Sequence, residues 1–149
     1  MKTESKYCLI VTGGSVDQNL LATVYEGAYG YPVHPYVIGV DKGLEMLEQL
    51  DIEPDLIIGD FDSANDGIRA KYVTSPDAVV REKCVVLNPE KDFTDTHVAV
   101  LEAAKRGFTR ALLLGATGTR LDHTLGNLGL LYTCCQEGIH AEILITGFL

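Results

Sequence analysis

Six short apolar runs are spaced along the chain, and most of them are followed by a stretch with helical periodicity. The runs, rich in aliphatic and β-branched residues, cover 7–12, 35–40, 55–59, 83–87, 110–115 and 141–146. Nearly continuous apolar strands are typical of a parallel sheet covered on both faces. Helices are predicted over 17–27, 42–50, 64–73, 94–107 and 121–137. The pattern predicts one domain over residues 1–149, a three-layer Rossmann-like α/β fold with a mostly parallel sheet of about six strands.

The last two predicted helices each have a recognisable apolar side. Spacing by three or four residues brings together Val98, Leu101 and Ala104 or Lys105 in the first, and Leu125, Leu128 and Tyr132 in the second. Such a side is expected to mark how each helix is oriented in the fold.

Polar residues gather where the predicted strands end. In open parallel α/β sheets, ligands bind outside the carboxyl ends of the strands. Asp60 and Asp62 follow the third strand and point the same way if the extended path continues through Phe61. Two close carboxylates repel unless a cation lies between them, and Mg²⁺ suits such a place. The alternative is that Asp62 or Ser63 caps the next helix.

Another acidic pair follows the fourth strand. Asp92 and Asp95 lie three residues apart at the start of a predicted helix, where acids are also favoured as caps or by the helix dipole. Lys91 beside them is less simply explained, and a base among acids suits a phosphate group. Both interpretations of the acids stay open at this point.

The turn after the fifth strand, "GATGTRLDHTLGN", combines glycines with Arg120, Asp122 and His123. Glycines such as Gly115 let a backbone approach a ligand closely, and helix-start amides with an arginine favour an anion. Asp122 is a candidate metal ligand, base or cap, and His123 a supporting donor or a ring that packs on a base. Together, the three strand ends predict a Mg²⁺–polyphosphate site.

Composition narrows the classes of partner. Twelve basic against twenty-one acidic residues give a net charge of −9, which disfavours nucleic-acid binding. No apolar run reaches the length of a membrane helix, and the first residues do not form a secretion signal, so we expect a cytoplasmic protein that binds no membrane. The four cysteines form no Cys-x-x-Cys pair and are expected to be free structural thiols.

Three stretches, "PDLIIGDFDS", "NPEKDFTDTHVAV" and "LLGATGTRLDHTLGNLGLL", resemble the main motifs of thiamine pyrophosphokinases, in the order and at the approximate spacing of that family. "VTGG" (11–14) and "VDKG" (40–43) are also similar to family positions. One difference is that Gly118, Thr119 and Arg120 stand where the family usually has Gly-Gly-Arg.

The resemblance implies Mg²⁺-dependent transfer of pyrophosphate from ATP to thiamine, giving thiamine diphosphate and AMP, by a homodimer. It makes Asp60, Asp62 and Asp92 metal ligands, and these three with Asp95 the catalytic acids, with Asp62 or Asp95 as the base. It implies that ATP and its metal are bound by Gly14, Asp41, Lys91, Gly115, Arg120, Asp122 and His123.

The family also has a second, β-sandwich domain after the α/β domain, which helps to form the thiamine site across the dimer. That domain is expected to be absent from this chain, which resembles the catalytic, ATP-binding domain alone. Two alternatives remain open: a pyrophosphokinase that acts on a hydroxymethyl pterin, and a nucleotide-binding module without activity of its own.

Overall fold

The computed structural model describes residues 6–59, 67, 69–87, 94–117 and 121–144, and within them it shows an α/β domain. The sheet contains β1 (Tyr7–Val11), β2 (Tyr36–Val40), β3 (Leu56–Gly59), β4 (Cys84–Val86), β5 (Arg110–Leu114) and β6 (His140–Ile143). Their order is β4-β3-β2-β1-β5-β6, and every neighbouring pair is parallel. The predicted fold class is confirmed, and the described residues contain no β-sandwich.

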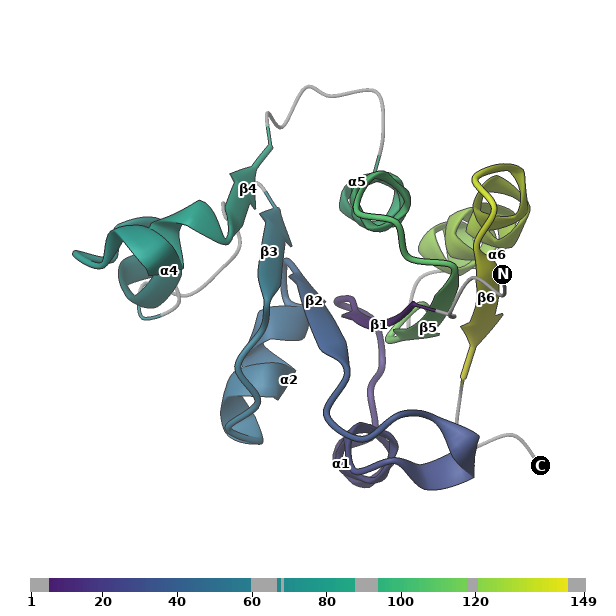
Figure 1. Cartoon of the computed structure of the whole chain (residues 1–149), viewed down its shortest axis with the longest axis horizontal. Helices are drawn as coiled ribbons and strands as arrows, with labels where there is room; N and C mark the ends of the chain where they lie inside the picture. The colour runs from purple at the N-terminus through teal and green to yellow at the C-terminus, as the bar shows by residue number, and fades with distance from the viewer. Residues whose placement is uncertain (1–5, 60–66, 68, 88–93, 118–120, 145–149) are drawn as a thin grey trace, which may run out of the picture.

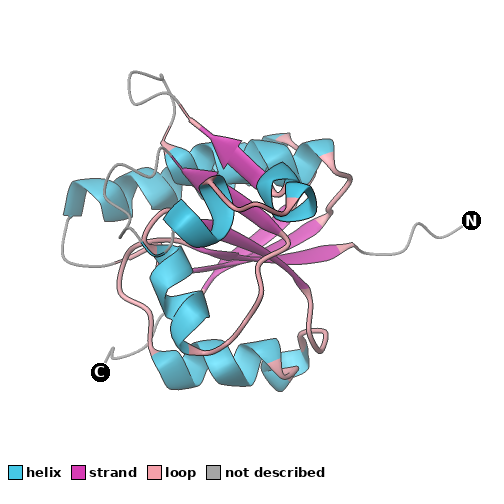
Figure 2. Cartoon of the chain, turned by 90° about the vertical axis from the view of Figure 1, so that its left-hand side faces the viewer, coloured by secondary structure: helices cyan, strands magenta, loops and turns pink. Residues whose placement is uncertain are grey.

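Helices cover both faces of this sheet (Figures 1 and 2). They are α1 (Gln18–Tyr25), the 3₁₀ turn η1 (Ala28–Gly30), α2 (Gly43–Gln49), the π-helical turn η2 (Arg69–Val73), α4 (Ala78–Glu82), α5 (Asp95–Lys105) and α6 (Leu121–Gln136). Figure 1 shows α1 and α2 below the sheet and α5 and α6 above it. In the described part of the chain, no helix is long and apolar enough to cross a membrane.

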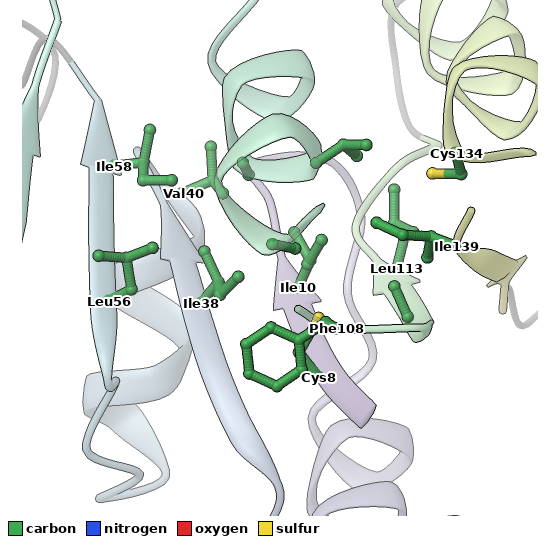
Figure 3. Close-up of a cluster of buried hydrophobic side chains, with 14 of the residues drawn as sticks. Cys8, Ile10, Ile38, Val40, Leu56, Ile58, Phe108, Leu113, Cys134 and Ile139 are labelled. Carbon is green, nitrogen blue, oxygen red and sulfur yellow. The ribbon is translucent and has the colours of Figure 1, made fainter. Parts of the chain in front are cut away.

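Alternate residues of each central strand enter different cores, as the two-residue period of a strand requires. On the lower face, Leu9, Val37, Ile57 and Leu112 pack with residues of α1 and α2. On the upper face, the core shown in Figure 3 joins Ile10, Ile38, Ile58 and Leu113 to α5 and α6. The central strands therefore have no polar face, which explains their nearly continuous apolar runs.

Small side chains bring α5 close to the sheet. Its buried residues are Thr96, Ala99, Val100 and Ala103, of which the last three belong to the upper core. The face predicted around Val98, Leu101 and Ala104 or Lys105 is confirmed only in part: Val98 and Ala104 pack against the upper core from its margin, whereas Leu101 is partly buried and Lys105 is exposed. Hydrophobicity favoured the larger residues, whereas the close approach of helix and sheet requires alanine.

The helix α4 (Ala78–Glu82) was not predicted. It is short, and it begins at Asp77, whose carboxylate accepts a hydrogen bond from the Val79 amide at 2.9 Å. An aspartate before an apolar pair is a usual helix start, so the N-cap was the available signal. The helix predicted over 64–73 lies partly outside the described residues, and the end of this range forms the turn η2.

The cysteines are free, as predicted. Cys8 and Cys134 are buried in the upper core, and burial raises the pKa of the Cys8 thiol to about 12 and that of Cys134 to about 11. Both therefore stay protonated at neutral pH and behave as small apolar side chains.

Candidate functional site

The carboxyl ends of five strands lie in one continuous row. Backbone bonds run from the Leu87 amide to the Gly59 carbonyl (2.8 Å), from the Asp41 amide to the Ile58 carbonyl (2.9 Å) and from the Thr12 amide to the Leu114 carbonyl (2.9 Å). These bonds extend the pairing of β4 with β3, of β3 with β2 and of β1 with β5 to the ends of the strands. The predicted convergence of these strand ends at one edge is confirmed.

The order of the strands reverses between β1 and β5. From β1 the chain proceeds outward through β2 and β3 to β4, and it then returns to the other side of β1 as β5. The connection after β1 leads to α1 below the sheet, and that after β5 leads to α6 above it (Figure 1). A crevice at such a reversal is the usual ligand site of an open α/β sheet.

At the reversal, the two glycine turns bind each other. The Gly14 amide donates to the Gly115 carbonyl (2.8 Å), and the Ser15 amide donates to the Thr117 carbonyl (2.7 Å). A Cβ atom on Gly14 would collide with the carbonyl oxygens of Gly115 and Thr117. The Gly14 and Gly115 turns are therefore held by backbone-to-backbone contact, whereas the sequence alone suggested glycines that admit a ligand.

Gly115 has a second reason to be glycine. Its φ of 78° lies in the left-handed region, and a Cβ atom there would collide with the Thr12 carbonyl oxygen. The next residue, Ala116, accepts a hydrogen bond at its carbonyl from the Asn127 side-chain amide of α6 (2.9 Å). Asn127 was not predicted as a site residue, although an amide among leucines and glycines in the middle of the helix was a signal for such a contact.

Asp41 directly follows β2 and has a strained backbone conformation. Its φ is 48°, a left-handed value that aspartate tolerates better than most residues. Its amide continues the sheet by bonding to Ile58, and its carbonyl accepts the Leu44 amide at the start of α2 (3.1 Å). The residue is partly exposed and lies at the carboxyl edge of the sheet. Strain held in place at such an edge is typical of functional positions.

Asp95 begins α5 at the same edge. Thr94 is the N-cap, and its hydroxyl oxygen accepts the His97 amide at 3.1 Å. Thr94 therefore fills the capping position that the sequence left open for Asp92. Asp95 is partly exposed in the first turn, where the helix dipole stabilises a carboxylate.

A buried pair of threonines joins β1 to α5. The Oγ1 atoms of Thr12 and Thr96 are 2.8 Å apart, and the two residues are only 6% and 5% exposed. Thr96 follows Asp95 directly, so this bond fixes the first turn of α5 against the end of β1. Sequence reasoning missed the pair, because a threonine that ends an apolar strand gives no signal for its distant partner.

Most of the predicted site residues are not among those that the structure places. Asp60, Asp62, Lys91, Asp92 and Arg120 lie outside the described residues, while Asp122 and His123 are placed in the first turn of α6 only by the path of its backbone. Within the described part of the chain, no three His, Cys, Asp or Glu residues gather as a metal site. The metal, catalytic and nucleotide-binding roles therefore remain predictions.

At the amino edge of the sheet, near β1, aromatic and charged side chains pack against one another. The rings of Tyr7 and Tyr31 stack with centroids 5.4 Å apart, and the Arg110 guanidinium lies 5.6 Å from the first and 5.9 Å from the second. The Tyr31 hydroxyl donates to Glu142 (2.9 Å); burial and this bond to a carboxylate raise the pKa of Tyr31 to about 12. Aromatic packing at this edge contrasts with the partly exposed acids at the other.

Three comparisons with known proteins all indicate similarity to thiamine pyrophosphokinases. The family described as thiamin pyrophosphokinase, catalytic domain, matches residues 32–143. The thiamine pyrophosphokinase of Bacillus subtilis (strain 168) is 34% identical over 111 residues, which are 74% of this chain and 50% of that protein.

Solved structures agree in fold. The crystal structure of the thiamine pyrophosphokinase from Bacillus subtilis has a TM-score of 0.72 at 30% identity, over 93% of this chain and 60% of that one. The thiamin pyrophosphokinase from Geobacillus thermodenitrificans gives 0.68 at 29% identity, over 93% and 59%. The chain thus spans about half the length of its curated relative and about three fifths of these crystallised chains.

Comparing Gly115→Ala with Gly138→Ala separates the cost of a left-handed backbone from the cost of a steric collision. Gly138 has an almost identical φ of 77°, but nothing lies within 4 Å of a Cβ atom placed there. Gly138→Ala should therefore cost about 1–2 kcal/mol of unfolding free energy from the left-handed conformation alone. Gly115→Ala should cost about 1–3 kcal/mol more, because the β1 and β5 turns must move apart. Urea denaturation measures both, and equal losses would contradict the interlock.

A double-mutant cycle tests the threonine pair. Thr12→Val or Thr96→Val alone leaves one buried hydroxyl without its partner and should cost about 1–3 kcal/mol of unfolding free energy. Thr12→Val with Thr96→Val removes both hydroxyls, so the double variant should lose less than the sum of the single losses. Additive losses, measured by urea denaturation, would show that the hydrogen bond contributes nothing.

Proposed function

Because the chain belongs to the thiamin pyrophosphokinase catalytic-domain family, we propose that it transfers the pyrophosphoryl group of ATP to thiamine, giving thiamine diphosphate and AMP. The supporting observation is the reversal of strand order between β1 and β5, beside which Asp41 and Asp95 present partly exposed acids. A carboxyl edge of this kind is where an α/β sheet binds a nucleotide.

In the proposed reaction, the hydroxyethyl oxygen of thiamine attacks the β-phosphorus of ATP. The bond from that phosphorus to the oxygen shared with the α-phosphate breaks, and AMP leaves with this oxygen. The hydroxyl proton passes to a carboxylate, for which Asp62 and Asp95 are the two candidates. Asp95 has in its favour the partly exposed position at the start of a fixed helix.

The acids at the carboxyl edge fit a divalent cation. Partly exposed Asp41 lies against the end of β3, where a Cβ atom on Gly59 would be 3.4 Å from the Asp41 Cα, and Asp60 follows Gly59 directly in the sequence. Asp60, Asp62 and Asp92 would hold Mg²⁺, which offsets charge on the phosphoryl oxygens when it is bound. Oxygen ligands from carboxylates are those that Mg²⁺ prefers.

The remaining predicted residues would contact either the phosphate groups or the rest of the nucleotide. Lys91 and Arg120 supply positive charge for the polyphosphate, and the Arg120 guanidinium is suited to bidentate contact. Asp122 and His123, at the start of α6, complete the nucleotide site. Gly14 and Gly115 act by holding the β1 and β5 turns in register beneath it. Two copies of the chain form the working assembly.

Acceptor identity is tested with the full chain, ATP and Mg²⁺. We expect AMP to form when thiamine is added and not when a hydroxymethyl pterin replaces it, with thiamine diphosphate detected by chromatography. AMP with the pterin alone would support the pterin enzyme instead. ATP binding without AMP from either acceptor would indicate a nucleotide-binding module.

Asp60→Asn tests the metal role. The variant should lose turnover by about a hundredfold or more, because a cation ligand for the reacting phosphates is removed. Its circular dichroism and thermal midpoint should match those of the wild type. Asp51→Asn is a suitable control, because Asp51 is an exposed acid before β3, near the amino edge, and the same change there should leave turnover intact. Wild-type rates in Asp60→Asn would refute its role.

A further inference from the structure

The side chain of Asn127 joins helix α6 to the turn after β5. Its amide donates a hydrogen bond to the Ala116 carbonyl oxygen at 2.9 Å. The carbonyls of Gly115 and Thr117, on either side of Ala116, accept amides from the turn after β1 at 2.8 and 2.7 Å. Of these three consecutive carbonyls, the outer two are therefore held by the turn after β1 and the middle one by α6.

The first half of α6 depends on this contact. Between positions 125 and 129, all of which the structure describes, Asn127 is the one residue that is not exposed. Two of the exposed residues are Gly126 and Gly129, and a Cβ atom at either position would have nothing within 4 Å. Glycine is a poor helix former, so this half of the helix is intrinsically weak. Within 125–129, Asn127 is thus the anchor to the rest of the domain.

The second half of α6 is held in another way. Leu130 and Cys134 are 4% and 0% exposed, and Cys134 belongs with Ile139 to the upper core. The strand that follows the helix, β6, pairs with β5. These contacts do not involve Asn127, so loss of the Asn127 bond should loosen the start of the helix while the domain stays folded.

Helix propensity does not explain an asparagine at this position. Alanine, leucine and glutamine all form helices better. What the asparagine adds is a hydrogen-bond donor, and its acceptor belongs to Ala116, which is only 2% exposed. Contact with the turn is therefore the property that distinguishes Asn127 from a better helix former.

The stretch whose ends are joined by this bond contains nucleotide-binding residues of the proposed function. Arg120, Asp122 and His123 lie between positions 116 and 127. A bond that joins these two positions limits the conformations that the stretch can adopt before a ligand arrives. Order that exists before binding lowers the entropic cost of binding.

We propose that Asn127 is a positioning residue for ATP, and that it raises the affinity of the carboxyl edge for the nucleotide by holding α6 against the turn after β5. It acts through the backbone of Ala116 and does not have to touch ATP. The inference rests on the nucleotide binding in the proposed function, but it does not depend on the acceptor. Loss of the bond should therefore change the affinity for ATP and leave the chemical step in place.

Calorimetric titration of the full chain with ATP and Mg²⁺, without thiamine, tests the effect on affinity. Asn127→Ala should raise the dissociation constant by about three- to tenfold, which is the effect of one hydrogen bond. In the complete reaction, the KM for ATP should rise by a similar factor, and kcat should change by less than about twofold. Asn19→Ala is the matched control: Asn19 is an exposed asparagine of α1, and its variant should bind ATP like the wild type.

Asn127→Leu separates hydrogen bonding from packing. Leucine is close to asparagine in size and branching but has no donor, so the affinity for ATP should fall as it does in Asn127→Ala. Hydrogen exchange without nucleotide gives a second measurement. In both variants the Gly14 and Ser15 amides should exchange faster, because their acceptors lie in the loosened turn. The amide of Leu113, in the upper core, should exchange at the wild-type rate.

Circular dichroism checks that each variant is folded, and Asn127→Leu replaces Asn127→Ala if the latter is not. Unchanged affinity for ATP in either variant would overturn the inference, as would an equal loss in Asn19→Ala or unchanged exchange of the Gly14 and Ser15 amides. A wild type that binds no ATP would overturn both the inference and the proposed function. A wild type that binds ATP more tightly than Asn127→Ala but forms no AMP would support the inference and contradict only the proposed function.

Discussion

The contact on which the rest of the carboxyl edge depends is the pair of hydrogen bonds between the turn after β1 and the turn after β5. These turns leave neighbouring strands and run to opposite faces of the sheet, so beyond the bond from the Thr12 amide to the Leu114 carbonyl the β1–β5 pairing no longer holds them together. Gly14 and Gly115 allow their backbones to meet, and the Thr12–Thr96 bond then fixes α5 beside them. These contacts restrain the backbone around the carboxyl edge. They therefore fix the start of α5, where the partly exposed Asp95 lies.

The central strands could be predicted from sequence because almost every residue of a strand covered on both faces is apolar, so strand and burial give the same signal. Helix orientation could not be predicted in the same way. In α5 the buried face is made of Ala99, Val100 and Ala103, while the larger Leu101 lies to the side. Hydrophobicity ranks leucine above alanine, but the distance between helix and sheet decides which of them fits. That distance is a property of the whole packing.

The location of the candidate site could be predicted from the sequence, but the contacts that shape it could not. The rule that ligands bind at carboxyl ends of strands directed attention to Asp41, Gly14, Gly115 and Asp95, and the structure brings their strand ends to one edge. The sequence did not reveal that the glycines hold each other. Nor did it reveal the Thr12–Thr96 bond, because the two threonines are 84 positions apart. Such a pair becomes visible only when β1 and α5 are in place.

Helix α6 connects the site to the surface of the molecule. Its first turn contains Asp122 and His123, and Asn127 holds the Ala116 carbonyl in the β5 turn. Leu125 and Leu128, on either side of Asn127 in the sequence, are exposed. The same helix therefore has a surface side and a side that holds the turn after β5. Because the Asn127 side chain bonds directly to the backbone of that turn, the position of α6 and the geometry of the carboxyl edge are linked.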